Sequence, residues 1–312
     1  MISKWATPSN GTTMIQGKDI IYVNGDSFTE GCDIADHLYP NFEKNYSLNE
    51  LLSIPFADAI ANQKNSIREK VAFADANGAK NFEFNTYQMT LRWSSVLQNI
   101  LNKPVVNLSS RGGSSMYAIA YRTMADVVAL KDQGYNITDI IIQVTAGGRW
   151  DIFKNTEDSE EPQRFLNGEP PETSKILKYN ITSANIQSSK YQGLMEQILL
   201  YETFDFNDYR AIHDLFTLKH ALTALTNARI IFVDSAFYRK TISGDKFFTF
   251  KNCNLPDDIH VVKFKKQLDQ EIELSMLECV EPNEPETITM GMHFTAKVHE
   301  LFAKRIAERY FR

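Results

Sequence analysis

The chain has 312 residues, of which 43% are hydrophobic and 23% are charged, an ordinary balance for a globular protein. Its 33 basic and 39 acidic residues give a net charge of −6, which argues against a nucleic-acid-binding groove. No segment approaches the roughly 20 consecutive apolar residues that cross a bilayer. Residues 1–11 lack the apolar core of a secretory signal, so we expect a cytoplasmic protein.

The first predicted strand starts at Asp19 and runs directly into Gly25-Asp26-Ser27. A serine in the bend between a strand and a helix exposes its hydroxyl at the carboxyl end of the strand. The first amides of the helix then point at whatever the hydroxyl attacks, because they have no partner within the helix. Ser27 is therefore a candidate nucleophile, and the alternative is that it only caps the next helix.

Two further strand-to-helix turns follow in chain order. The second strand, Val105 to Leu108, leads into a turn that contains Gly112 and Gly113. A residue without Cβ lets a substrate oxygen approach the backbone N–H closely, although glycine is also common in turns that need a positive φ. The third strand, Ile137 to Thr145, reads as buried apart from Gln143.

The chain closes with a loop that contains His293, followed by an amphipathic helix from Glu300 to Phe311. His293 and His299 are the two histidines of this region, and either could be a base or a packed residue. His293 stands in the loop before the helix, and His299 is the alternative base.

Taken together, these blocks resemble the SGNH (GDSL-type) hydrolases over the span from Asp19 to Phe311. The resemblance implies a three-layer α/β/α sandwich with a flavodoxin-like parallel sheet. It also implies an esterase, lipase or carbohydrate deacetylase in which Ser27 is the nucleophile and His293 its base. Gly112 falls where the family has its oxyanion-hole glycine, with Gly113 as the fallback, so the expected oxyanion hole consists of the N–H groups of Ser27 and Gly112.

The chain departs from the family pattern at two positions. Where the family has an Asn that donates to the oxyanion, this chain has Gly147, and Arg149 or Thr145 is a possible replacement donor. A surface ion pair of Arg149 with Asp151 or Glu157 is equally compatible with the sequence. Where the family has an Asp three residues before the base, this chain has Met290.

Other residues near the motifs are possible auxiliaries of this site. Glu286 or Glu284 could reach the base from the preceding loop, and Asp26 adjoins the nucleophile. Cys32 lies close after Ser27 and could line the site, but a lone cysteine usually acts as a small apolar residue. Cys32, Cys253 and Cys279 have no metal-site spacing, so we expect free thiols, no metal and no cofactor.

The rest of the chain alternates helix and strand signals, which favours one domain with a parallel sheet covered on both faces. Helices are predicted over residues 48–63, 86–101, 114–131, 184–201, 209–226 and 265–279, and strands over 228–234 and 257–264, the last one weak. Residues 153–181 are rich in charge and proline and read as a loop insertion, either a lid over the site or a spacer.

These observations predict a serine ester hydrolase with a Ser27–His293 dyad or incomplete triad, acting on a small-molecule or glycan ester. The alternative is a catalytically inactive binding or assembly protein with the same fold. A third possibility is acyl transfer to an acceptor other than water. The sequence carries no signal for an oligomeric state.

Overall fold

The computed structural model describes residues 19–32, 34–35, 45–54, 58, 87–109, 115–145, 150–155, 176–181, 204–235, 259–289 and 293–312. Its centre is a parallel four-stranded sheet with the strand order β2-β1-β3-β6. The strands are β1 (Asp19–Asn24), β2 (Val105–Asn107), β3 (Asn136–Val144) and β6 (Arg229–Asp234). The predicted strands at these four places are confirmed, with ends that differ by one residue.

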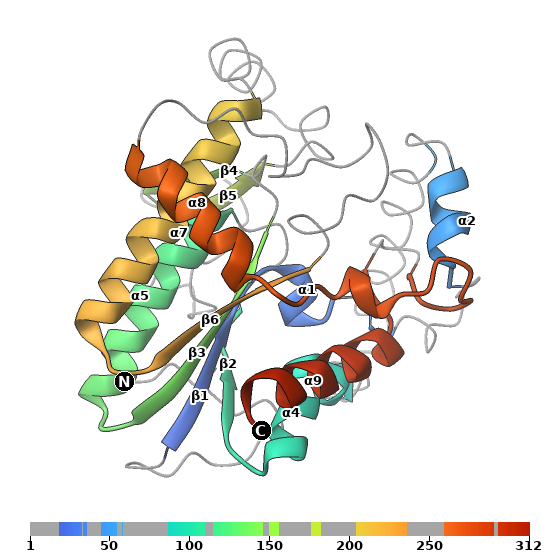
Figure 1. The fold of residues 1–312 in the computed structure, drawn as a ribbon, viewed down its shortest axis with the longest axis horizontal. Helices are drawn as coiled ribbons and strands as arrows, with labels where there is room; N and C mark the ends of the chain where they lie inside the picture. Colours follow the sequence, from blue (N-terminus) through green and yellow to red (C-terminus); the bar gives the residue numbers. More distant parts are fainter. Residues whose placement is uncertain are drawn as a thin grey trace.

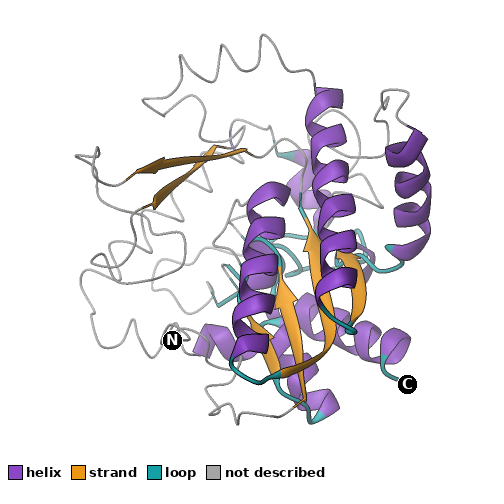
Figure 2. Cartoon of the chain, turned by 90° about the vertical axis from the view of Figure 1, so that its left-hand side faces the viewer, coloured by secondary structure: helices purple, strands orange, loops and turns teal. Residues whose placement is uncertain are grey.

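Helices cover both faces of this sheet (Figures 1 and 2). One face packs against α5 (Met116–Asp132), α7 (Phe204–Leu225) and α8 (Ile259–Glu271). The other face packs against α4 (Trp93–Leu101) and α9 (Ala296–Tyr310). The predicted three-layer α/β/α architecture is therefore confirmed.

The alternation of side chains along β1 explains the two layers of the core. Ile20 and Tyr22 lie in the cluster with α5, α7 and α8, whereas Ile21 and Val23 lie in the cluster with α4 and α9. All four are buried, as expected for a central parallel strand whose two faces are both covered.

The strand order places the end of β1 at a special position. β2 pairs with one edge of β1 and β3 with the other, so the chain reverses its direction of progress across the sheet at β1. In open α/β sheets, ligands bind beyond the carboxyl ends of the strands at such a switch point. Ser27 follows β1 directly.

Several predicted elements differ from the structure. The weak strand over 257–264 is wrong, because Ile259–Glu271 form helix α8. Phe264, Leu268 and Ile272 recur every four residues and are buried against the sheet, and this packing overrides the strand preference of the β-branched residues before them. The predicted helix over 265–279 ends at Glu271 and is followed only by a 3₁₀ turn, Leu277–Cys279.

The helix predicted over 86–101 is interrupted at Arg92. Residues 87–91 are helical, Arg92 is extended with φ −68° and ψ 150°, and α4 starts at Trp93. The helix predicted over 48–63 is present as α2 (Leu48–Ser53), and most of its remainder lies outside the described residues. The predicted helix over 184–201 also lies outside them.

The region predicted as a loop insertion contains regular structure at both ends. β4 (Trp150–Asn155) and β5 (Ile176–Ile181) form an antiparallel pair separate from the main sheet. Residues 156–175 between them lie outside the described residues, and the lid function stays a prediction. Among the helices in the described part of the chain, none has both the length and the apolar character that crossing a bilayer requires.

Candidate active site

Ser27 is the first residue of a short helix, α1 (Ser27–Glu30), which begins directly after β1. Asp26 caps this helix: its Oδ1 accepts a hydrogen bond from the Phe28 N–H at 3.0 Å. Its second oxygen, Oδ2, accepts one from the Thr145 hydroxyl at the end of β3, at 2.6 Å. Asp26 and Thr145 are both buried, so this pair joins the start of α1 to the neighbouring strand.

The turn between β1 and α1 is packed so closely that only glycine fits at position 25. A Cβ on Gly25 would lie 2.1 Å from the Thr29 Oγ1 and 2.9 Å from the Gln143 Cβ. The Thr29 hydroxyl donates to the Gln143 side-chain oxygen, which makes a second link between α1 and β3. The position of α1 is thus set by β3 as well as by β1.

His293 comes from a narrow hairpin near the end of the chain. The Thr289 N–H donates to the His293 carbonyl at 2.8 Å, and the His293 N–H donates to the Thr289 hydroxyl at 3.1 Å. Ile288 and Phe294 form an antiparallel bridge beside this pair. Two hydrogen bonds to Thr289 therefore hold the backbone N–H and carbonyl of His293 just before α9 begins.

The fold brings Ser27 and His293 together across 266 positions of sequence. The Ser27 Oγ lies 2.8 Å from the His293 Nε2, which is hydrogen-bonding distance. The Phe28 ring packs against the imidazole with 5.0 Å between ring centroids. If the ring proton is on Nδ1, Nε2 can accept the hydroxyl proton, which is the arrangement that a nucleophile and its base require.

The backbone N–H of Ser27 has no hydrogen-bond acceptor among the described residues. It is the first amide of α1 and stands beside the side chain that would attack a carbonyl. Ser27 is only 4% exposed, so a small reacting group at this amide would be largely shielded from water. The amide is therefore available to stabilise an oxyanion.

His299, the alternative base, lies in a different environment. It is in α9, it is completely buried, and its Nδ1 accepts a hydrogen bond from the Trp93 N–H at 3.1 Å. Burial, with smaller contributions from His293 and Arg92, lowers the pKa of His299 to about 3. Its imidazole is thus neutral and joins α9 to the start of α4, and it makes no hydrogen bond to Ser27 in the described structure.

The structure gives specific places to three other predicted residues. Thr145 donates its hydroxyl proton to Asp26, so in this arrangement the proton is not directed at an oxyanion. Glu284 pairs with Lys297. The Glu286 side chain is exposed and makes no hydrogen bond to His293 among the described residues.

Cys32 is partly exposed, and its thiol lies 3.6 Å from a Glu30 carboxylate oxygen. The backbone N–H of Cys32 donates to the Ser27 carbonyl. The remaining predicted positions fall outside the described residues. They are Gly112, Gly113, Gly147, Arg149 and Met290.

Several residues that hold α1 in place were missed at the sequence level. The Gln88 side chain donates to the Gly31 carbonyl at 3.0 Å, and the Asn107 side chain donates to the Thr29 carbonyl at 2.9 Å. Gln143 was noticed as the one polar residue in an apolar strand, but its link to Thr29 was not foreseen. A polar residue inside a buried strand, or an Asn at a strand end, is the signal that could have indicated these contacts.

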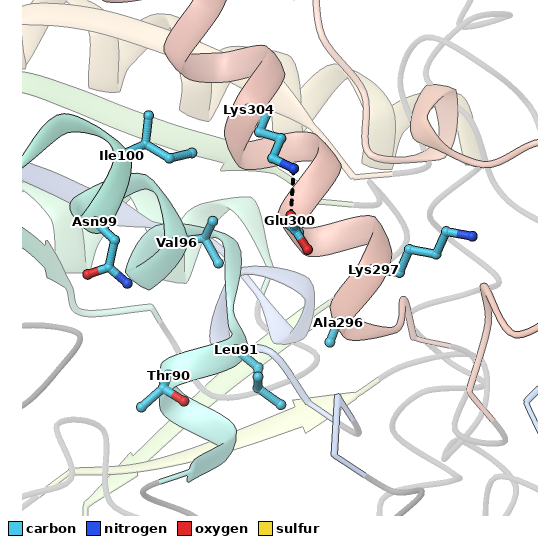
Figure 3. A pocket seen from close by; sticks show the side chains of 9 residues that line it. All are labelled: Thr90, Leu91, Val96, Asn99, Ile100, Ala296, Lys297, Glu300 and Lys304. Carbon is cyan, nitrogen blue, oxygen red and sulfur yellow. Dashed lines mark hydrogen bonds and ion pairs between the residues drawn. The ribbon is translucent and has the colours of Figure 1, made fainter.

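A groove of about 590 Å³ lies on the outer side of the α4–α9 layer (Figure 3). Apolar side chains of Leu91, Val96 and Ile100 line it, and Glu300 and Lys304 form an ion pair at its rim. Neither Ser27 nor His293 is among its lining residues. The groove is therefore separate from the candidate active site.

Comparisons with known proteins return similarity at the level of structure. One similar structure is a carbohydrate esterase family 2 enzyme plus carbohydrate binding domain of Corynascus thermopiles (Myceliophthora fergusii), at 10% sequence identity and a TM-score of 0.39. Another is a carbohydrate esterase whose active site displays divergent catalytic and non-catalytic binding functions, at 12% identity and the same TM-score. Each alignment covers 95% of this chain and 68% of the other. No protein-family model and no curated protein sequence matches the chain.

Proposed function

We propose that this protein is a serine ester hydrolase in which Ser27 is the nucleophile and His293 the general base. The observation that carries the proposal is the 2.8 Å contact between the Ser27 Oγ and the His293 Nε2. The contact lies at the carboxyl end of β1, where the strand order of a parallel sheet reverses and ligands bind. The Ser27 N–H, which has no acceptor among the described residues, adds the start of an oxyanion hole.

The reaction follows from these groups. The Ser27 Oγ attacks the acyl carbonyl while His293 takes its proton, and the oxyanion of the tetrahedral intermediate is held by the Ser27 N–H and, we expect, by that of Gly112. The imidazolium of His293 then gives the proton to the departing alcohol, which leaves an acyl group on Ser27. Water attacks this acyl-enzyme with His293 again as the base, and the acid is released.

The absence of a carboxylate at position 290 is expected to lower kcat. In serine proteases the corresponding Asp keeps the histidine in the correct tautomer and stabilises the imidazolium, and its replacement by Asn lowers kcat by about 10⁴. In this chain the Thr289 contacts hold the His293 backbone and the Phe28 ring packs against its imidazole, but neither contact stabilises the imidazolium as a carboxylate does. We therefore expect a slower enzyme than a complete triad gives, acting on reactive esters such as acetates.

We also propose that the substrate is a small-molecule or glycan ester. The competing function is a non-catalytic binding or assembly protein, which Gly147 and Met290 favour because they stand where the resembled family has its Asn and Asp. Acyl transfer differs from hydrolysis only in the acceptor and would appear as a new ester when an alcohol is supplied.

Hydrolysis of p-nitrophenyl acetate tests the proposal. Ser27→Ala should remove the activity, because no other group supplies the nucleophile, and His293→Gln should lower kcat by about 10³ or more. Ser235→Ala is the matched control: Ser235 is a buried serine that follows β6, the edge strand beyond β3, and its loss should leave the rate within about twofold. Equal rates in wild type and Ser27→Ala would contradict the proposal.

A fluorophosphonate probe separates the two classes of function. Such a probe reacts with an activated serine, so an esterase should be labelled at Ser27 and the His293→Gln variant should be labelled far more slowly. A well-folded wild-type chain that remains unlabelled would favour the non-catalytic alternative.

A further inference from the structure

Asn107, the last residue of β2, makes three hydrogen bonds with one side chain. Its Nδ2 donates to the Thr29 carbonyl at 2.9 Å and to the Ser94 hydroxyl at 2.8 Å. Its Oδ1 accepts from the Ser109 N–H at 2.9 Å. Asn107 is 8% exposed, so these bonds are formed largely out of contact with water, where an unmade bond is costly.

These bonds join three separate segments. Thr29 belongs to α1, the helix that begins with Ser27. Ser94 belongs to the first turn of α4. Ser109 is the last described residue after β2 and precedes Gly112 by three positions in the sequence.

We propose that Asn107 is a positioning residue, which sets the distance between the nucleophile helix and the segment that follows β2. The inference rests on the proposed hydrolase function. Oxyanion stabilisation requires donors 2.7–3.1 Å from the oxygen, and a displacement of about 1 Å in an active site can cost about 10² in rate. The Ser27 N–H lies on one of the joined segments, and the other leads to the expected second donor.

Asn24 is a second asparagine with which Asn107 can be compared. Asn24 is also a buried asparagine at the end of a strand, β1, but its Nδ2 donates to the Ile119 carbonyl and the Thr123 hydroxyl, both in α5. Its Oδ1 accepts from the adjacent Gly25 N–H. Through these bonds Asn24 joins β1 to α5, whereas Asn107 joins β2 to α1 and α4.

The amide group of Asn107 is needed because it supplies two donors and one acceptor at once. An Asp of the same shape keeps the acceptor for Ser109 but places a second acceptor against the Thr29 carbonyl. A Ser is neutral and shorter, so it cannot reach Thr29, Ser94 and Ser109 together. The two substitutions break the same bridge in different ways.

The experiment measures kcat and KM for p-nitrophenyl acetate in Asn107→Asp and Asn107→Ser, per fluorophosphonate-reactive site. Counting reactive sites removes the effect of any misfolded fraction. We expect kcat to fall about tenfold or more in both variants while KM changes less than about threefold, because the lost geometry matters mainly in the transition state. The inhibition constant of a phenylboronic acid, which forms a tetrahedral adduct with the serine, should rise by a similar factor.

Ser94→Ala is the matched control, because it removes one partner of the same amide and leaves the link between α1 and Ser109 intact. It should keep kcat within about twofold even if its melting temperature falls. A kcat per reactive site within twofold of wild type in both Asn107 variants would overturn the inference. A wild-type protein without Ser27-dependent turnover would instead overturn the proposed function, and the inference with it.

Discussion

Two histidines that are close in sequence, His293 and His299, lie in different surroundings. His293 lies in a partly exposed hairpin and faces a hydroxyl. His299 lies one turn into α9 and is surrounded by the core, and the only hydrogen bond of its side chain in the described structure is the one that Nδ1 accepts from the Trp93 N–H. The surroundings of His299 exclude charge, because burial lowers its pKa.

The burial of His299 predicts an acid sensitivity of folding. Its pKa is about 3 in the folded state and near 6.5 when unfolded, so between these values only the unfolded chain binds the proton. Unfolding is therefore favoured as the pH falls, by about 1.4 kcal/mol per pH unit below 6, and the effect is absent above 7. His299→Asn keeps an acceptor for the Trp93 N–H but cannot be protonated.

Urea unfolding at pH 7, 6, 5 and 4 measures this effect. The free energy of unfolding of wild type should decrease more steeply below pH 6 than that of His299→Asn, because all other titrating groups are common to both. The Asn variant should be less stable at pH 7, where the smaller side chain leaves a cavity. Parallel pH profiles for the two proteins would show that His299 does not titrate differently on folding.

At the scale of an element, α1 is a helix of four residues that cannot be stable alone. It is held by side chains from other parts of the chain: Asp26 joins it to Thr145, Thr29 to Gln143, and Asn107 to its backbone. Ser27, the proposed nucleophile, is thus positioned by contacts with the ends of the strands rather than by its own helix.

Gly25→Ala should show how little space this arrangement leaves. The added Cβ would overlap Thr29 and Gln143, and overpacking of this kind costs about 1–3 kcal/mol. The variant should have a lower urea midpoint, and its esterase activity should fall because α1 must move. Adding Thr29→Ala should not restore stability, since the Thr29 Cβ at 2.8 Å and the Gln143 Cβ at 2.9 Å remain. Recovery in that double variant would contradict the packing argument.

The sequence predicts an element well where its local residue pattern and its packing in the fold favour the same secondary structure. β1, β2, β3 and β6 are short apolar runs bounded by turn residues, and they were found within one residue. The strand prediction for residues 257–264 is wrong because the β-branched side chains there favour a strand. Phe264, Leu268 and Ile272 are buried at a spacing of four residues, which requires a helix. The break at Arg92 has no proline or glycine to mark it.

The candidate site was predictable as two motifs but not as a network. Gly25-Asp26-Ser27 and His293 stand in local patterns, and their 2.8 Å contact is consistent with the prediction. The contacts of Asn107 and Gln143 depend on which strands are neighbours. No local sequence pattern predicts that β1 pairs with both β2 and β3.

At the scale of the whole molecule, the candidate site exists only when both halves of the core are formed. Ser27 depends on the sheet, while His293 depends on the hairpin before α9 and on the packing of α9 against α4. The Trp93 and Phe302 rings meet edge to face, 5.6 Å apart, at the centre of this helix pair. Phe302→Ala should therefore cost about 3–5 kcal/mol and weaken the support of His293.

This dependence predicts that activity and structure are lost together. In a urea titration of wild type, ester hydrolysis and far-UV circular dichroism should have the same midpoint, because the joining of residues 266 positions apart requires the complete fold. In Phe302→Ala both midpoints should move to lower urea by the same amount. If activity disappeared at clearly lower urea than the circular dichroism signal, α9 and its hairpin would detach as a separate unit, and the dyad would depend on local rather than global stability.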